Sequence, residues 1–504
     1  MHRRLLALLL LAPALLDAPS PGAVADGGAV TMPLVQVSGP DPYAACPPGS
    51  SRNGAEYPDS AVEPQIAIDP ATIGTDHVHL VGVWQQDRWN DGGAQGIAGA
   101  VSFDGGATWH EIALPFSRCA ANGAAFTRAS DPWVAIGPDG VVYASAVAVS
   151  ASPDVGGADA AGVLVAVSHD GGLTWSAARL LPESTSGGDG ARIVTDPRRP
   201  GTAYAVWPSF NLSTSGTVIV LNQTTDGGDH WSAPRIVRPI WLGKNTGIGA
   251  NLLVDPRTGA LYLDTVTVRD KPPKRTCHVV KDKHHPRGRR RCRTTRYPWY
   301  DTKITRGVTT STDGGISWRR PVTGVREIQP HVIPETVRAA GLTDTAIDPR
   351  SGRLYMVWVD GRFGHGLQGL AVSSSGDGGR TWTRPVAAAA PSGELAFDPS
   401  IRVNSSGDVG VTYDTIPLGA SPAASAAVWF TVSMDQGAHF TPAEELAGPF
   451  SIATAPRAGS YAFVGDYQGL TAGDAFYPFF VTTASGHAAV YSAAIRVSSA
   501  SATP

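Results

Sequence analysis

The segment SHDGGLTW, residues 168–175, directly follows the apolar run VLVAV, residues 163–167. Its pattern is Ser/Thr-x-Asp-x-Gly-x-Thr/Ser-Trp, and five further copies occur along the 504 residues, the last of them degenerate. The Asp residues of the six copies are Asp104, Asp170, Asp226, Asp313, Asp377 and Asp435. A pattern repeated at this spacing indicates similar structural units arranged side by side rather than unrelated domains.

The chemistry within each copy is structural. An Asp carboxylate can accept backbone N–H groups across a tight turn, and Gly supplies the positive φ that such a turn requires. The Trp then covers the hairpin with a large buried surface. We therefore expect these six Asp residues to hold turns and not to take part in catalysis.

This pattern resembles the Asp-box, or BNR, repeat of sialidases and related β-propellers, and the resemblance spans nearly the whole chain after its N-terminal segment. It implies an all-β protein folded as a single β-propeller with four-stranded blades. Asp-boxes also occur in xyloglucanase-like hydrolases, sortilin-like receptors and photosystem assembly factors. The motif therefore implies a fold and does not name a reaction.

A second repeat predicts the number of blades. Extended runs that end in Asp-Pro or a similar turn, and lead into a strand rich in Tyr and Trp, occur seven times, for example at 66–70 and 193–197. The seventh unit, roughly 460–498, lacks both a box and a fourth strand. A strand-like run at 32–37 can supply that strand and close the ring. We predict seven blades closed by the N-terminal strand, with six, the number in the sialidase family, as the alternative.

The composition and the N-terminus bound the class of protein. Charged residues make up 16% and the net charge is −3, which argues against a disordered chain and against polyanion binding by bulk charge. Residues 1–25 have the basic start, short apolar stretch and small-residue end of a signal peptide. We assign 26–62 to an N-terminal segment and 63–504 to the propeller. We expect a secreted, bacterial, monomeric protein without a transmembrane segment, since no later apolar run reaches 18 residues.

The four cysteines predict two disulfides in an oxidising compartment. Cys277 and Cys292 enclose a short segment and are expected to pair, which leaves Cys46 with Cys119. Neither a CxxC spacing nor a ligand-spaced His cluster occurs, and nothing in the sequence indicates a nucleotide or flavin. We therefore expect no metal and no cofactor.

A basic insertion at 269–300 interrupts the fourth unit. Between Arg269 and Arg296 there are 12 Lys or Arg and 2 Asp, a net charge of +10, so the remainder of the chain carries −13. We expect the disulfide to staple this insertion as a hairpin. It is either a solvated hairpin, a contact for an anionic polymer (polysaccharide, teichoic acid, nucleic acid or a membrane surface), or a lid over the channel.

The innermost strand of each unit predicts which side chains face the central channel. When these strands are aligned on their turn residue, two rows lie on the same side because strand side chains alternate. The rows include Glu63, Gln65, Asp131, Trp133, Arg192, Asp344, Asp398 and Asp466. Mutual repulsion raises some pKa values in such a carboxylate cluster, and glycoside hydrolysis commonly uses one protonated and one ionised carboxyl group. The alternatives are a cation site, solvated rim charges, or turn capping by Asp131 and Asp398.

Two loops that follow second strands are similar to sialidase elements: WQQDR at 84–88 with the nearby Asp91, and WVDGR at 358–362. By this resemblance Asp87 or Asp91 is a catalytic acid/base and Tyr467 is the nucleophile. Substrate-binding roles fall to Arg88, Asp360, Arg192, Arg362 and Arg402, the last three as clamps on a substrate carboxylate.

The sequence departs from the sialidase pattern at two places. The Arg-Ile-Pro element that opens sialidase domains is replaced by Glu63-Pro64-Gln65-Ile66, and no Glu clearly pairs with Tyr467. The sequence predicts a secreted, sialidase-like exo-glycosidase that acts on extracellular glycans. The alternative is a non-catalytic propeller that binds glycans or proteins, whether or not it once carried an enzyme site.

Overall fold

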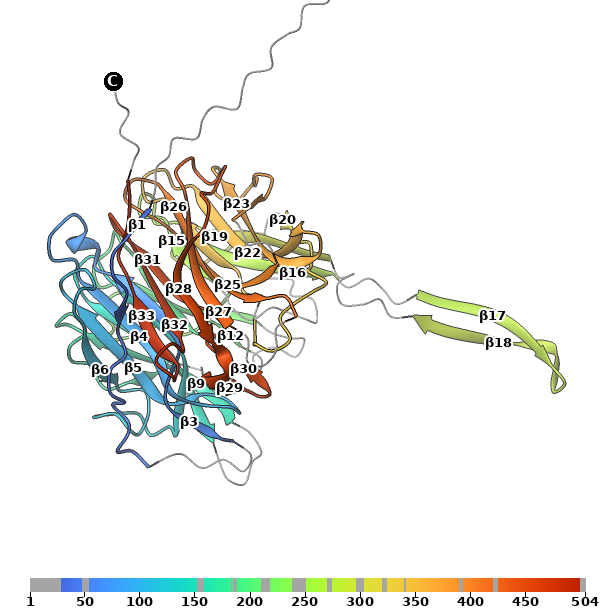
Figure 1. Ribbon diagram of the computed structural model, residues 1–504, viewed down its shortest axis with the longest axis horizontal. Coiled ribbons are helices and arrows are strands. Elements are labelled where there is room, and N and C mark those ends of the chain that lie inside the picture. The colour runs from blue at the N-terminus through green and yellow to red at the C-terminus, as the bar shows by residue number, and fades with distance from the viewer. Residues whose placement is uncertain are drawn as a thin grey trace, which may run out of the picture.

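The computed structural model describes residues 29–47, 54–151, 158–182, 184, 188–209, 218–237, 251–269, 274–295, 303–319, 324–339, 341–388, 393–419 and 425–498. The predicted signal peptide lies outside these residues. Across them the chain is a single all-β propeller whose antiparallel sheets surround a central axis (Figure 1). Its helical elements in this part of the chain are short 3₁₀ turns such as η1 (Pro70–Thr72) and η4 (Ile452–Thr454). No helix among the described residues is long and apolar enough to cross a membrane.

The first sheet of the ring has eight strands, formed by two consecutive four-strand units that join through the pair Ala94 and Ala129. Its strands are β3 (Glu56–Ile68), β4 (Leu80–Trp89), β5 (Ala94–Ser102), β6 (His110–Leu114), β7 (Arg128–Ile136), β8 (Val142–Ala151), β9 (Ala158–Ser168) and β10 (Arg179–Leu180).

Four separate four-stranded sheets follow in chain order. The first two consist of β11 (Arg192–Thr195), β12 (Ala203–Ser209), β13 (Val218–Thr224) and β14 (Arg235–Val237), then β15 (Leu252–Val254), β16 (Leu261–Arg269), β19 (Lys303–Ser311) and β20 (Val325–Arg326). The next two consist of β21 (Asp344–Ile347), β22 (Leu354–Gly364), β23 (Leu367–Ser375) and β24 (Val386–Ala387), then β25 (Glu394–Val403), β26 (Val409–Pro417), β27 (Ser425–Ser433) and β28 (Glu444–Ser451).

The last sheet joins the two ends of the chain. It contains β31 (Gly469–Ala472), β32 (Phe476–Thr482), β33 (Ala489–Ser492) and β34 (Ile495–Val497), with β1 (Ala29–Thr31) on β34 and β2 (Val35–Gln36) on β33. The pairing of β2 with β33 adds the N-terminal strand to the final sheet, in the manner the sequence predicted. A small hairpin, β29 (Arg457–Ala458) and β30 (Tyr461–Ala462), precedes this sheet.

The predicted number of blades is not confirmed. A count of separate blades around the ring gives five, not seven or six. The ring departs from equal, separate blades where the chain begins and ends. There, one hydrogen-bonded pair merges two units into an eight-stranded sheet, and strands from both termini build a six-stranded one.

The six repeated turns share one hydrogen-bond pattern. In the first, Asp104 Oδ1 accepts the N–H of Thr108 at 2.9 Å and Oδ2 accepts its hydroxyl at 2.6 Å, while Ser102 Oγ accepts the N–H of Gly106 at 2.8 Å. Gly106 has φ of 86°, where a side chain would be strained. The backbone bond to Oδ1 recurs at Asp170, Asp226, Asp313, Asp377 and Asp435. A hydroxyl again binds Oδ2 at Asp170, Asp313 and Asp377, whereas the ring of His230 or His439 takes its place at Asp226 and Asp435.

These bonds favour the ionised carboxylate. Hydrogen bonds from the residue four positions later lower the pKa of Asp226, Asp313 and Asp377 to about 2. The carboxylates are therefore used within their own turns, which is the structural behaviour expected of the repeat.

The core lies between neighbouring sheets. Trp84, Trp207 and Trp358 occupy equivalent places on the second strands β4, β12 and β22 and are fully buried. The first and last sheets pack closely where the Phe479 ring lies against the backbone of Gly82. A Cβ atom at Gly82 would lie 2.2 Å from this ring. Glycine at this position therefore lets the final sheet pack against the first.

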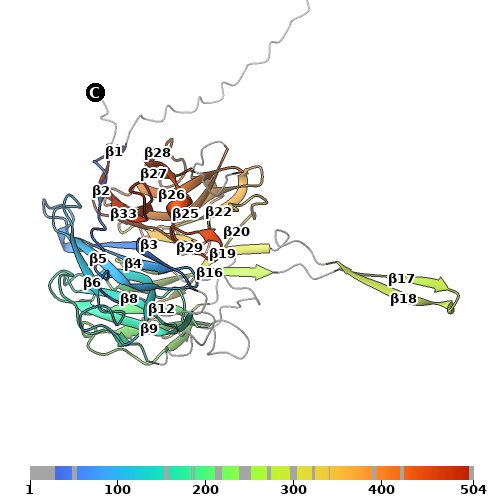
Figure 2. The ribbon, with the colours of Figure 1, turned by 60° about the horizontal axis from the view of Figure 1, so that its bottom comes forward.

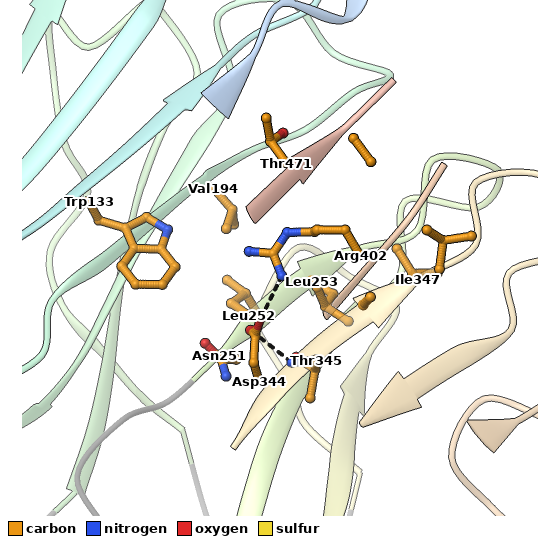
Figure 3. Close-up of a pocket in the computed structure, with 13 residues that line it drawn as sticks. Trp133, Val194, Asn251, Leu252, Leu253, Asp344, Thr345, Ile347, Arg402 and Thr471 are labelled. Atoms are coloured by element: carbon orange, nitrogen blue, oxygen red, sulfur yellow. Dashed lines mark hydrogen bonds and ion pairs between the residues drawn. The ribbon is translucent and has the colours of Figure 1, made fainter. Parts of the chain in front are cut away.

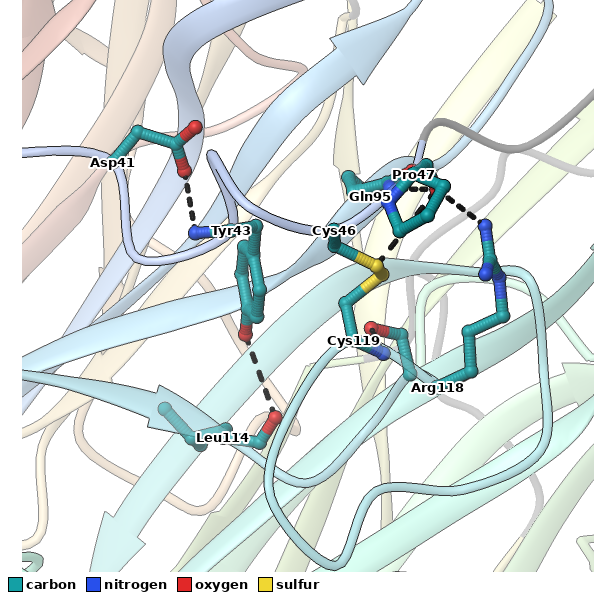
Figure 4. Close-up of a disulfide and its surroundings, with 9 residues drawn as sticks. Asp41, Tyr43, Cys46, Pro47, Gln95, Leu114, Arg118 and Cys119 are labelled. Carbon is teal, nitrogen blue, oxygen red and sulfur yellow. Dashed lines mark hydrogen bonds between the residues drawn. A yellow bond between two sulfur atoms is a disulfide. The ribbon is translucent and has the colours of Figure 1, made fainter.

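Both predicted disulfides form. Cys46 bonds to Cys119 and ties the N-terminal segment to the loop that follows β6 (Figure 4). Beside it, the buried Tyr43 donates its hydroxyl to the Ile97 carbonyl at 2.7 Å, and the Pro47 carbonyl accepts a hydrogen bond from Gln95 at 3.0 Å. The segment that precedes the first sheet is thus anchored by a covalent bond and by polar contacts.

The second disulfide, Cys277–Cys292, lies in the basic insertion. There β17 (Lys274–Asp282) and β18 (His285–Thr295) form a two-stranded sheet in which these two cysteines are opposite each other. We name this pair of strands the basic arm. Both views show it extending away from the ring and not folded over the channel, so the structure does not support the lid alternative (Figures 1 and 2).

The two disulfides predict different effects on stability. Replacing Cys46 and Cys119 by Ser should lower the free energy of unfolding of the ring by about 4 kcal/mol, because their sequence separation of 73 residues closes a long loop in the unfolded chain. Urea unfolding followed by tryptophan fluorescence measures this change.

The matched control is the double Ser variant of Cys277 and Cys292. Since the basic arm extends away from the ring, this variant should unfold at the same urea concentration as the parent protein. Equal effects of the two double variants would contradict the assignment of Cys46–Cys119 as the anchor of the N-terminal segment.

Candidate functional site

A cavity of about 240 Å³ lies on the ring axis, bordered by the first strands of several sheets (Figure 3). Trp133 comes from β7, Val194 from β11, Asp344 from β21, Arg402 from β25 and Thr471 from β31. Arg402 Nη1 contacts Asp344 Oδ2 at 2.7 Å within this cavity. The first strands therefore line the centre of the ring, which is the arrangement that the strand alignment assumed.

Three of these inner strands carry the same unusual bulge. Glu63, Asp131 and Asp398 each precede a proline and have positive φ values of 54°, 51° and 45°. The pairing of each strand with its neighbour shifts register at this residue. Residues before proline normally stay extended, and positive φ is unfavourable for any residue with a Cβ. Repetition of this strained geometry on three strands turns three acidic side chains toward one region.

That region holds six carboxyl groups, which we name the acidic cluster. Its members are Glu63, Asp131, Asp189, Asp398, Asp414 and Asp466. Two guanidinium groups face it. Arg88 donates to Gln85 Oε1 at 2.7 Å, Gln85 in turn donates to Glu63, and Arg338 forms an ion pair with Asp466. Carboxyl groups therefore outnumber the positive charges that face them.

Burial and mutual repulsion raise several pKa values in the cluster. Burial raises the pKa of Glu63 well above its ordinary value, with further increases from Asp131 and Asp466 that Arg88 opposes. Asp131 lies close enough to Glu63 that the repulsion between the two carboxyl groups adds to the effect of burial on the pKa of Glu63, which favours its protonated form. Burial, with the charge of Asp131, raises the pKa of Asp189 to about 7.

An aromatic pair stands beside the cluster. The rings of Trp133 and Tyr467 meet edge to face with centroids 5.6 Å apart, and Arg192 lies over the Trp133 ring at 4.1 Å. The Tyr467 hydroxyl donates to the Pro132 carbonyl at 3.3 Å. Burial raises the pKa of this tyrosine well above its ordinary value, and Glu63 raises it further. The sequence offered no Glu partner for Tyr467, whereas the structure places Glu63 in its electrostatic environment.

A second, smaller cavity lies between the aromatic pair and the cluster. Its volume of about 10 Å³ leaves room for one water-sized group. It is lined by Gln65, Trp133, Arg192, Leu342, Thr343, Asp344, Asp398, Pro399, Asp466, Tyr467 and Gln468. Both predicted rows of channel-facing residues therefore contribute to one site.

The two acid/base candidates of the first loop lie outside this site. Asp87 accepts the N–H of Asp59 at 2.8 Å, and its acidic neighbours are Asp41 and Glu56 rather than members of the cluster. Asp91 forms an ion pair with Arg128 at 2.8 Å. The resemblance placed them by their distance from a strand, but tertiary partners direct both side chains elsewhere.

The second loop is a closed structural unit. Asp360 is fully buried and accepts hydrogen bonds from Trp358 Nε1 at 2.8 Å and from the Arg362 guanidinium at 2.8 Å and 2.9 Å. The Arg362 guanidinium therefore neutralises the neighbouring Asp360 carboxylate and does not face the acidic cluster.

The three predicted arginine clamps consequently do not converge. Arg402 is paired with Asp344, and Arg192 donates to Asn251 beneath the Trp133 ring, although these two arginines do influence each other electrostatically. The structure assembles the carboxyl groups and the aromatic pair, and it leaves the three-arginine arrangement unformed.

Sequence reasoning missed three charged residues of the site. Asp189 lies three positions before the channel-facing Arg192, so the alternation of strand side chains would place it on the opposite side; the positive φ of 54° at Gly190 interrupts that alternation. Asp414 lies on the second strand β26. Arg338 lies on the connection between β20 and β21, beside Val337, which forms a bridge with Ala462. That connection carries no repeat that could have marked it.

No family model matches the chain, and no curated protein matches it. Among solved structures it is similar to a protein of unknown function from Dyadobacter fermentans, with 14% identity, 94% of this chain and 100% of that chain covered and a TM-score of 0.45. It is also similar to an α-L-arabinanase from Penicillium chrysogenum complexed with arabinobiose (15% identity, 75% and 95% coverage, TM-score 0.43). A third is the Hadza microbial sialidase Hz136 (13%, 93% and 96%, TM-score 0.41). Similarity at this level carries no argument about activity, so function must be argued from the site.

The buried carboxyl groups predict that stability falls as the pH rises from 5 to 8. Burial raises the pKa of Asp87, Asp189 and Asp264 to about 7. Their stabilising contribution is complete below the unfolded pKa near 3.8 and is lost as the pH rises through about 7. The depressed pKa values of the turn Asp residues act only below this window. The melting temperature should therefore drop by several degrees between pH 5 and pH 8.

Asp87→Asn should reduce this drop, because the amide does not ionise and asparagine tolerates the positive φ of 61°. Asp76→Asn, at an exposed position, is the matched control and should leave the drop unchanged. Melting curves that stay level or rise toward pH 8 would contradict the assigned direction of these pKa shifts.

Proposed function

We propose that the protein is a secreted glycoside hydrolase that releases sugars from the ends of extracellular glycans, with the acidic cluster as its active site. One observation carries the proposal: the buried Glu63, with its raised pKa, has the carboxyl group of Asp131 as a close electrostatic neighbour, and both lie near the aromatic pair of Trp133 and Tyr467. Glycoside hydrolysis needs a proton donor and an ionised carboxylate in adjacent environments. The small cavity next to Trp133 admits one water-sized group, which fits contact with a single sugar hydroxyl rather than with a whole sugar unit.

In this proposal the protonated carboxyl group of Glu63 donates its proton to the glycosidic oxygen as the bond to the sugar breaks. Asp131 and Asp189 stabilise the positive charge that develops on the sugar and accept a proton from the attacking water. Trp133 packs against a face of the sugar ring. Arg88 and Arg338 keep the cluster from accumulating negative charge.

The repeated turns support membership in the Asp-box, or BNR, group of propellers. Within that group we favour division of the ring into seven four-strand units. A sialidase-type variant would use Tyr467 as the nucleophile with Glu63 as its base. The alternative function, a non-catalytic propeller that binds glycans or proteins, is favoured by the burial of Glu63, whose surface is only 2% exposed.

The remaining proposals concern the environment of the protein. The resemblance of residues 1–25 to a signal peptide and the two disulfides support export, and we propose a bacterial protein that acts as a monomer. The +10 charge of residues 269–296 supports contact of the basic arm with an anionic polymer, which would hold the enzyme near its substrate.

Hydrolysis of a panel of aryl glycosides tests the activity. Glu63→Gln and Asp131→Asn should each lower kcat/KM by about 10²-fold or more, because each removes a group that donates or balances the transferred proton. Glu335→Gln and Asp59→Asn make the same chemical changes at exposed positions and should retain full activity; Asp59 also shares the positive φ of Asp131. The enzyme proposal fails if no glycoside is cleaved while glycan binding persists.

Salt-dependent retention on heparin tests the basic arm. Replacement of Arg289, Arg290 and Arg291 by Gln should move elution to a lower NaCl concentration, because each lost charge releases fewer counterions on binding. The control replaces three exposed arginines of the ring, Arg380, Arg384 and Arg496, and should elute with the parent protein. If the arm variant elutes with the parent, the arm does not bind polyanions.

A further inference from the structure

Asp398 is a buried carboxyl group whose two oxygens lack a hydrogen-bond partner within the described part of the chain. It is 2% exposed, and among the described residues neither of its carboxyl oxygens has a hydrogen bond. Its own backbone carbonyl accepts from Gln468 Nε2 at 2.8 Å, so the main chain is fixed while the side chain is unsatisfied. A buried polar group without a partner is costly and is rare in folded proteins unless a ligand or water completes it.

The small cavity contains this orphan group together with a second one. Asp398 and Asp466 both line it, and Asp466 Oδ1 is also unpartnered although Oδ2 pairs with Arg338. Behind them, Asp414 Oδ1 is unpartnered as well. Of these three carboxyl groups, Asp398 and Asp466 line the cavity, so one small donor placed there would satisfy both.

The size and surroundings of the cavity limit what that donor is. Its volume of about 10 Å³ admits one water-sized group such as a hydroxyl. Among the described residues there is no group of three or more His, Cys, Asp or Glu that could hold a metal ion. Trp133 and Tyr467 also line the cavity and supply aromatic surface of the kind that sugar rings pack against.

The charges of the cavity disfavour an anionic ligand. Its only lining arginine, within the part of the chain that is described, is Arg192, whose Nη1 donates to Asn251 and whose guanidinium lies over the Trp133 ring, while its Nε has no partner among the described residues. Against it stand the carboxyl groups of Asp398 and Asp466, with Asp344 already paired to Arg402. A carboxylate entering here would meet carboxyl oxygens rather than a guanidinium fork.

We propose that Asp398 and Asp466 form a subsite for a hydroxyl group of an uncharged sugar whose ring packs on Trp133. The subsite rests on the proposed function in that it lies in the same glycan site, but it concerns binding and not bond cleavage. The burial-raised pKa of Asp398 suits this role, because a protonated carboxyl group both donates to and accepts from a hydroxyl. The sialidase-type variant of the proposed function, which needs a carboxylate clamp, does not fit the subsite.

A matched pair of ligands tests the charge preference on the unmodified protein. Saturation-transfer NMR titrations with glucose and glucuronic acid, and with galactose and galacturonic acid, compare sugars that differ by a hydroxymethyl or a carboxylate group. At least one neutral sugar should bind about tenfold or more tightly than its acid, since an unpaired charge at a buried polar site is expensive. Tighter binding of the acids or of N-acetylneuraminic acid, or binding of none of these sugars, would overturn the proposal.

Variants test the residues. Asp398→Asn should weaken binding of the preferred neutral sugar about tenfold, since the amide alters a hydrogen bond to the hydroxyl. Asp59→Asn, with φ of 57°, matches it in residue type and backbone conformation and should bind normally. If Asp398→Asn does not fold, Trp133→Ala provides the second variant and should also lose binding. Unchanged binding in the folded variants would overturn the subsite.

The outcomes separate the two proposals. Selective binding of a neutral sugar without cleavage of any glycoside would keep the subsite and reject the hydrolase. Cleavage with an unchanged KM in Asp398→Asn would keep the hydrolase and reject the subsite.

Discussion

Closure of the ring is the constraint on which the candidate site depends. Gln65 and Gln468 are 403 residues apart, yet Gln65 donates to the Gln468 carbonyl at 3.3 Å. This contact exists because β2 pairs with β33 and because the first and last sheets approach closely at Gly82 and Phe479. Glu63 belongs to the start of this ring and Tyr467 to its end. If the ring opened between the first and last sheets, the residues of the site would separate while each sheet could stay folded.

The site also contains backbone conformations and buried carboxyl groups that lower the stability of the fold. Three acidic residues adopt positive φ before proline, each at a cost of about 1–3 kcal/mol. The carboxyl groups of Glu63 and Asp398 are buried, which disfavours their ionisation. The surrounding sheets, with their buried Trp84, Trp207 and Trp358, supply the stability that offsets these costs. Strain concentrated at the centre of an otherwise regular ring is typical of a functional site.

Much of the architecture could be predicted because it repeats. The turn around Asp170 occurs six times, so its pattern could be recognised in the sequence and predicted a β-propeller. Strand alternation then identified Glu63, Asp131 and Asp398 as neighbours, since a period of two leaves only one side facing the axis. The separation of blades did not follow, because a single pair between Ala94 and Ala129 depends on how closely two units approach.

Residues outside the strands were harder to predict. Asp91 follows β4 and Asp360 lies near the end of β22, but their side chains form ion pairs with Arg128 and Arg362. Such pairs are set by tertiary contacts, which spacing along the chain does not encode. Arg338 reaches the cluster from a connection that has neither periodicity nor repeat. Sequence periodicity therefore located the site, whereas ion pairing decided which of its charged residues face it.

The basic arm makes the distribution of charge over the molecule strongly asymmetric. Residues 269–296 carry +10 while the rest of the chain carries −13, and the arm extends away from the ring. Separation of charge over such a length produces a large dipole moment. In the field of a negatively charged surface, the protein would turn arm-first before any contact is made, and added salt would weaken this alignment.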